Sequence, residues 1–136
     1  MFTEASSPMP SELSPTAREA LYSTGHSLLG QDRHAEAAAL FRIMLRLAPT
    51  DERAWLALGE CHEGASHRGI ALELYTAGVA AAPNAARCEL ARFRILYDDD
   101  RTDEADAAFE SAREIAERSD DCALLELCIR ERQSRP

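Results

Sequence analysis

The sequence of 136 residues contains no lysine, and all 15 of its basic residues are arginine. Its 24 acidic residues give a net charge of −9, which repels phosphate backbones and argues against a nucleic acid partner. Aromatic residues make up only 6% of the chain, while alanine and leucine are plentiful. This composition is typical of helices that pack closely through small side chains.

Long apolar runs are missing as well. No stretch approaches the roughly 20 apolar residues of a membrane span, and the N-terminus has neither the basic cluster nor the apolar segment of a secretory signal. We therefore expect a cytoplasmic protein without direct membrane binding. No cysteines form a CxxC pair, so we predict that all of them are small buried hydrophobic residues rather than disulfides. They are Cys61, Cys88, Cys122 and Cys128.

The sequence does contain an internal repeat with a period of 34 residues. Six pairs of similar residues share this spacing: Gly25 and Gly59, Ala37 and Ala71, Phe41 and Tyr75, Pro49 and Pro83, Leu21 and Trp55, and Gly30 and Gly64. The pattern continues with Ala105 and Phe109, but Phe93 replaces the glycine and Glu117 replaces the proline. Glycine lets paired helices approach closely, the aromatic side chain fills the space between neighbours, and proline ends each second helix.

The repeat and its capping residues predict a series of helices. We expect helices over residues 15–29, 33–47, 51–64, 67–81, 85–97, 102–117 and 121–133. Ser14 is expected to cap the first of them, with Pro15 at its first position, and Thr50 or Asp51 and then Asn84 to cap later ones. Residues 1–14 are expected to be a disordered tail before a helical domain over 15–134. Its units would span 18–51, 52–85 and a degenerate 86–119, followed by a capping helix over 121–133.

The second unit carries most of the tetratricopeptide signature. The matching residues are Trp55, Leu58, Gly59, Ala71, Tyr75 and Pro83, and only His62 replaces the usual aromatic residue. The chain therefore resembles tetratricopeptide-repeat proteins. This resemblance implies an all-α fold, with about three helix-turn-helix units stacked in a right-handed solenoid and closed by the C-terminal helix.

Residues 21–83 are also similar to the tetratricopeptide chaperones that serve translocator proteins of bacterial type III secretion systems. The resemblance implies a non-enzymatic chaperone that binds an extended client segment, of a Pro-x-Leu-x-x-Pro-like type, and keeps the client soluble before export. Family members usually carry an N-terminal helical arm for dimerisation, whereas only a short Ser/Pro segment precedes Ser14. Both a monomer and a homodimer stay open, and a general scaffold that joins two folded proteins is the alternative function.

In this fold the first helix of each unit lines a concave groove. The resemblance places apolar pocket walls and charged register contacts in it. In addition to Glu19, the predicted groove residues are Tyr22, His26, Leu29, Arg53, Leu56, Glu60, Glu63, Arg87, Leu90, Arg94 and Tyr97.

The sequence gives little support for catalysis or metal binding. Cys61 and His62 are adjacent and diverge on a helix, so we expect no metal site. Paired carboxylates occur at Glu60 and Glu63 and at 98–100, but they lack a pocket and a placed nucleophile. No Gly-rich phosphate loop is present. We therefore expect neither an enzyme nor a cofactor, although a metal or thiol enzyme remains a hypothesis that metal analysis can test.

Overall fold

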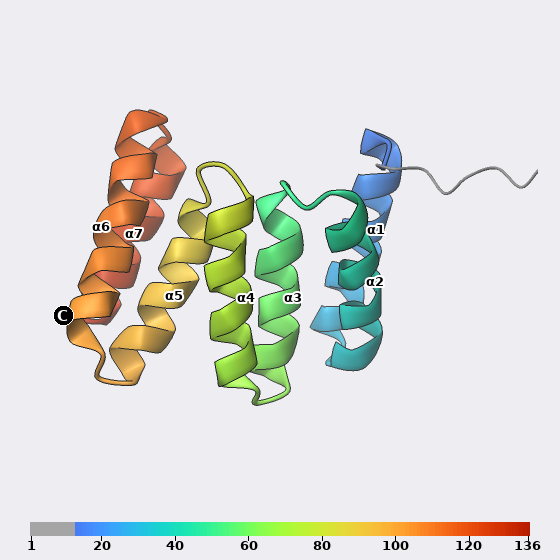
Figure 1. Ribbon diagram of the computed structural model, residues 1–136, viewed down its shortest axis with the longest axis horizontal. Helices are drawn as coiled ribbons and strands as arrows, with labels where there is room; N and C mark the ends of the chain where they lie inside the picture. Colours follow the sequence, from blue (N-terminus) through green and yellow to red (C-terminus); the bar gives the residue numbers. More distant parts are fainter. Residues whose placement is uncertain (1–12) are drawn as a thin grey trace, which may run out of the picture.

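A computed structural model describes residues 13–136, which form seven helices and are shown in Figure 1. The helices are α1 (Pro15–Gly30), α2 (His34–Leu47), α3 (Glu52–Gly64), α4 (Arg68–Ala81), α5 (Ala86–Asp98), α6 (Thr102–Arg118) and α7 (Cys122–Ser134). Each begins and ends within one residue of its expected position, so the all-α repeat fold is confirmed. Of the predicted tail, residues 1–12 lie outside the described part of the chain.

The helices form two layers. Helix α1 contacts α3, α3 contacts α5, and α5 contacts α7, whereas α2, α4 and α6 contact only helices of the other layer. The layer of α1, α3, α5 and α7 is therefore the inner, concave side of the stack, and α2, α4 and α6 are spread along its outer side. Figure 1 shows the stack running from α1 to α6 and α7.

Two of the predicted N-caps are confirmed and one is wrong. Ser14 accepts a hydrogen bond from the amide of Ala17 (3.1 Å), and Asp51 accepts one from the amide of Arg53 (3.0 Å). Asn84, however, does not cap α5, because its backbone is left-handed (φ 54°) and Ala85 occupies the cap position. The side chain of Asn84 instead accepts a hydrogen bond from Arg118.

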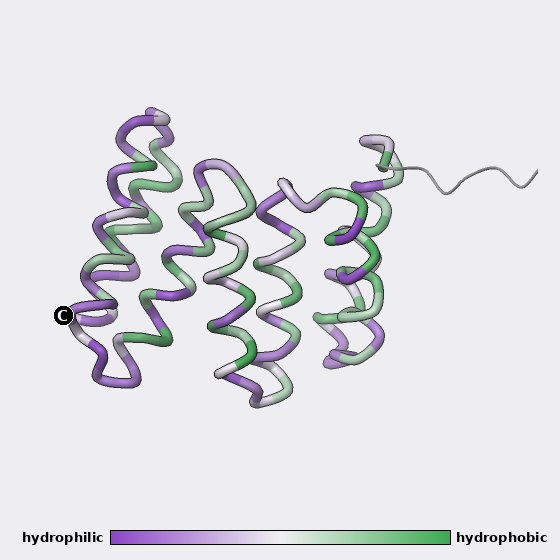
Figure 2. Tube along the Cα trace, viewed as in Figure 1, coloured by the Kyte–Doolittle hydropathy of each residue, from purple (hydrophilic) through white to green (hydrophobic). Residues whose placement is uncertain are grey.

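The turns between helices repeat as regularly as the helices do. Asp32, Ser66 and Asp100 have positive φ angles of 59°, 66° and 61°, and they lie 34 residues apart. At each of these residues, and at Asp120, the backbone amide of the residue itself and that of the next residue donate hydrogen bonds to carbonyls in the last turn of the preceding helix. This is the pattern of a Schellman motif. Figure 2 shows that the turn between α5 and α6 is hydrophilic. Short polar side chains thus occupy left-handed positions that usually favour glycine.

The core depends on the predicted pairs of glycine and aromatic ring. A Cβ atom on Gly25 would overlap the ring of Phe41, and one on Gly59 would overlap the ring of Tyr75. In the third unit Phe93 takes the place of glycine and packs against Phe109, with ring centroids 5.4 Å apart. Two rings therefore fill the space that glycine and a single ring fill in the first two units.

Helix α7 closes the core with one face. Leu124 and Cys128 are buried against α5 and α6, and the predicted burial of Cys128 is thereby confirmed. Ile129, in contrast, is 56% exposed. Cys122 is exposed at the first position of α7, so the prediction that it is buried is wrong. The remaining thiols, those of Cys61, Cys88 and Cys128, are buried and free. Within residues 13–136, every helix is too short or too polar to cross a membrane.

Candidate functional site

The inner surface of α1 and α3 presents apolar side chains that are only partly covered. Tyr22 and Leu29 of α1 and Leu56 of α3 are half-buried. The ring of Tyr22 contacts the ring of Phe41, with centroids 6.2 Å apart, and the guanidinium of Arg53 lies over the Tyr22 ring, 4.5 Å from its centroid. Leu56 packs against core residues from α4 and α5. These side chains leave an apolar surface fixed from below by the core.

A shallow hollow lies at the N-terminal end of this surface. Its volume is about 430 Å³, and its lining residues all come from α1: Glu19, Tyr22, Ser23, His26 and Ser27. Tyr22 and His26 were predicted from the repeat frame, and their rings lie 5.7 Å apart. Ser23 and Ser27 were missed, although each directly follows a predicted position in the sequence. Their hydroxyl groups add neutral hydrogen-bond partners beside the apolar ring.

Most charged groups of this surface are already paired within the protein. Arg53 donates to Glu19 (2.6 Å) and to Asp51 (3.1 Å), and these acceptors raise the pKa of its guanidinium. Glu63 accepts a hydrogen bond from the hydroxyl of Tyr75. Arg53 and Glu63 therefore lie on α3, which lines the inner surface, but their side chains are already hydrogen-bonded to neighbouring residues.

Glu60 of α3 lacks such a partner. It is half-buried at the centre of the inner surface, and no residue in the described part of the chain donates a hydrogen bond to it. Partial burial raises the pKa of its carboxyl above the ordinary value, while Arg94 of α5 and His26 of α1 act in the opposite direction. The carboxylate is thus partly shielded from water, with Arg94 on one side and His26 on the other acting on it only at longer range.

The third unit contributes less than predicted, because α7 and the residues after it cover much of it. Leu90 is only 1% exposed and packs against Leu124 and Cys128 of α7, so its assignment to the groove is wrong. Arg94 donates to Glu131 of α7 (3.3 Å), and the hydroxyl of Tyr97 donates to the carbonyl of Pro136.

Arg87 remains exposed at the start of α5. The open inner surface therefore consists mainly of α1 and α3, and α7 closes its C-terminal end.

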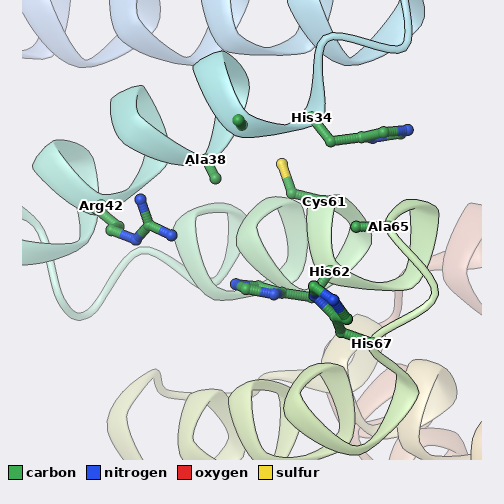
Figure 3. Close-up of a pocket in the computed structure, with 8 residues that line it drawn as sticks. His34, Ala38, Arg42, Cys61, His62, Ala65 and His67 are labelled. Carbon is green, nitrogen blue, oxygen red and sulfur yellow. The ribbon is translucent and has the colours of Figure 1, made fainter.

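A second hollow lies between α2, α3 and the turn before α4, with a volume of about 200 Å³. Figure 3 shows Cys61 pointing from α3 toward α2 at its floor. The imidazoles of His62 and His67 lie side by side, with ring centroids 5.7 Å apart, and His34 lines the opposite wall. Within residues 13–136, these and the other potential ligands form no group of three that could hold a metal ion.

Known proteins share this arrangement of paired helices. A family model described as tetratricopeptide repeat matches residues 18–61. The chain has the tetratricopeptide-repeat fold. The sequence matches none of the curated proteins with which it was compared.

Solved structures are similar to this chain over almost its whole length. The translocator chaperone SycD of Yersinia enterocolitica type III secretion superposes with a TM-score of 0.77, at 21% identity over 89% of each chain. PcrH from Pseudomonas aeruginosa gives 0.75 at 24% identity, over 90% of this chain and 93% of PcrH. PcrH in complex with the chaperone binding region of PopB gives 0.73 at 25% identity, over 88% of this chain and 97% of PcrH. The predicted resemblance to translocator chaperones is confirmed.

Proposed function

We propose that the protein is a type III secretion chaperone, which binds an extended segment of a translocator-like client on the inner surface of α1 and α3. The observation that carries the proposal is the row of Tyr22, Leu29 and Leu56, which are half-buried on the concave side and fixed from below by the core. Spaced apolar side chains of an extended peptide can dock on such a surface, while polar groups around it set the register. The PcrH complex with PopB supports this use of the fold.

The proposed mechanism needs no chemical step. A client that carries apolar, membrane-active segments aggregates when it is free, and binding lowers its free concentration by mass action. The client would be held in the cytoplasm until export. The predicted groove residues from the first two units, with Arg87 of the third, are the contacts that we propose for the client.

A peptide titration tests the proposal. The probe is a synthetic peptide with a Pro-x-Leu-x-x-Pro segment, and binding is followed by heat or by the fluorescence of Trp55. Leu56→Ala removes an apolar side chain from the inner surface, and we expect it to weaken binding by roughly tenfold. The substitution is to alanine and not to a charged residue, because Leu56 also packs against α4 and α5, where a charge would disturb the fold.

The matched control is Ile43→Ala. Ile43 is 45% exposed on α2, in the outer layer. Its substitution therefore removes a similar apolar side chain from the opposite side of the protein. Binding should be unchanged in this variant, and circular dichroism should show both variants folded. Equal losses in the two variants, or no binding by the wild type, would contradict the proposal and favour a scaffold that binds folded partners.

A further inference from the structure

We propose that Glu60 pairs with a cationic side chain, lysine or arginine, of the bound client segment. The inference rests on the proposed function and adds the chemistry of one client residue to it. Glu60 follows Leu56 by one helical turn on α3, so a segment that covers Leu56 also reaches this carboxylate. The site lies between α1 and α5, at the centre of the inner surface.

Two of the donors around Glu60, Tyr75 and Arg94, are hydrogen-bonded to other residues. The Tyr75 hydroxyl, on α4, donates to Glu63. Arg94, on α5, donates to Glu131 of α7, which also accepts from Arg135 (3.4 Å). His26, on α1, is exposed and acts on Glu60 only at longer range. Tyr75 and Arg94 would therefore each have to give up an existing partner to donate to Glu60.

Client binding would remove the water that Glu60 still has. An ionised carboxylate that loses its water without gaining a partner is strongly unfavourable, whereas a charge-assisted hydrogen bond to a cation offsets the loss. Glu63 lies one turn away and adds a second negative charge that favours a cation over a neutral donor. A client with a cationic residue at this register would thus be selected over one with a neutral or acidic residue.

The test uses a series of peptides and three forms of the full-length protein. The parent peptide contains Pro-Gln-Leu-Gln-Gln-Pro, and three further peptides each replace one glutamine by lysine. Each is titrated calorimetrically into the wild type, Glu60→Gln and Glu73→Gln at neutral pH and low salt. Glu73 is exposed on α4, in the outer layer, so its variant makes the same change in net charge away from the inner surface.

We expect one lysine register to bind the wild type on the order of tenfold more tightly than the parent peptide. Glu60→Gln should abolish this gain, and Glu73→Gln should keep it. The gain should also fade as the pH falls through the pKa of Glu60, because the neutral carboxyl no longer attracts a cation.

The other outcomes overturn the inference in distinguishable ways. If all peptides bind equally, or if the lysine gain survives in Glu60→Gln, the proposed function stands and the pairing at Glu60 is wrong. A gain that is lost to the same extent in Glu73→Gln reflects only the net charge of the protein and also refutes the pairing. If no peptide binds the wild type, the proposed function fails and this inference fails with it.

Discussion

The carboxylate of Glu52 in α3 accepts a hydrogen bond of 2.8 Å from the backbone amide of Cys88, in the first turn of α5. Helix α5 has no cap from its own cap residue, since Ala85 carries no polar side chain. A residue 36 positions earlier in the chain therefore satisfies an amide that local sequence leaves open. The contact also ties the second unit to the third.

Glu52→Ala is expected to destabilise the fold by about 1 kcal/mol, because the first turn of α5 loses its acceptor. Glu52→Gln should change the free energy of unfolding much less, since the amide oxygen can still accept the hydrogen bond. Urea unfolding followed by circular dichroism measures both variants. Equal losses would show that the charge of Glu52, rather than its acceptor, stabilises α5.

The same residue predicts a pH dependence. Burial raises the pKa of Glu52 above its ordinary value of 4.5, against the opposing effect of the hydrogen bond from Cys88. The folded chain thus binds a proton there more tightly than the unfolded chain, and the stabilising contribution is lost as the pH rises through the raised pKa. The stability of the wild type relative to Glu52→Gln should therefore fall as the pH rises above the ordinary value of 4.5 and through the raised pKa. A constant difference in the urea midpoints across this range would contradict the assignment.

Gly59→Ala is expected to destabilise the protein because its Cβ atom would overlap the ring of Tyr75, which is fully buried. The loss should be about 1–3 kcal/mol, the usual range for overpacking a core. Gly69→Ala is the matched control: it lies in α4, and an added Cβ there meets no atom within 4 Å. Alanine favours the helix over glycine, so this variant should be slightly more stable than the wild type. Thermal unfolding of the two variants checks both signs.

The sequence predicts the fold well because its repeat combines spacing with a physical role for each residue. Gly59 and Tyr75 meet as the 34-residue period requires, and Ser14 and Asp51 cap their helices as their side chains favour. Asn84 shows the limit of such local reasoning. Its side chain suits a cap, but its backbone is left-handed, and the acceptor comes from Glu52 in another unit.

The candidate site is predicted less completely, for a related reason. The repeat frame names the positions that face inward, but it does not show which neighbours cover or pair them. Leu90 fails as a groove residue because α7 packs directly over it. Glu60 and Arg53 are equivalent in the sequence as charged groove positions. Only the packed structure shows that Arg53 is paired and that Glu60 is not.

The four thiols should react very differently in the folded protein. Cys122 is exposed, while burial raises the pKa of Cys61 to about 11 and also raises the pKa values of Cys88 and Cys128. An aromatic disulfide reagent at neutral pH should therefore modify one thiol per chain rapidly, and the other three only after unfolding. Cys122→Ser should remove the rapid phase. A rapid phase that persists in this variant would show that a buried thiol becomes accessible in the native state.

Phe93→Gly restores the residue that the repeat pattern expects in the third unit, yet it should destabilise the protein. Phe93 is fully buried, and its ring centroid lies 5.8 Å from that of Tyr97 and 5.4 Å from that of Phe109. The guanidinium of Arg132 lies 5.7 Å from the centroid of the Phe93 ring. Because Phe109 does not fill this space alone, removal of the ring leaves a cavity that should cost at least about 3 kcal/mol.

Phe93→Leu keeps most of the volume and should cost less than half as much. Urea unfolding measures both losses. A Phe93→Gly variant as stable as the wild type would mean that Phe109 moves into the vacated space, as the rings of Phe41 and Tyr75 do beside their glycines. The third unit would then be a tetratricopeptide repeat of the same packing as the first two, rather than a unit rebuilt around two rings.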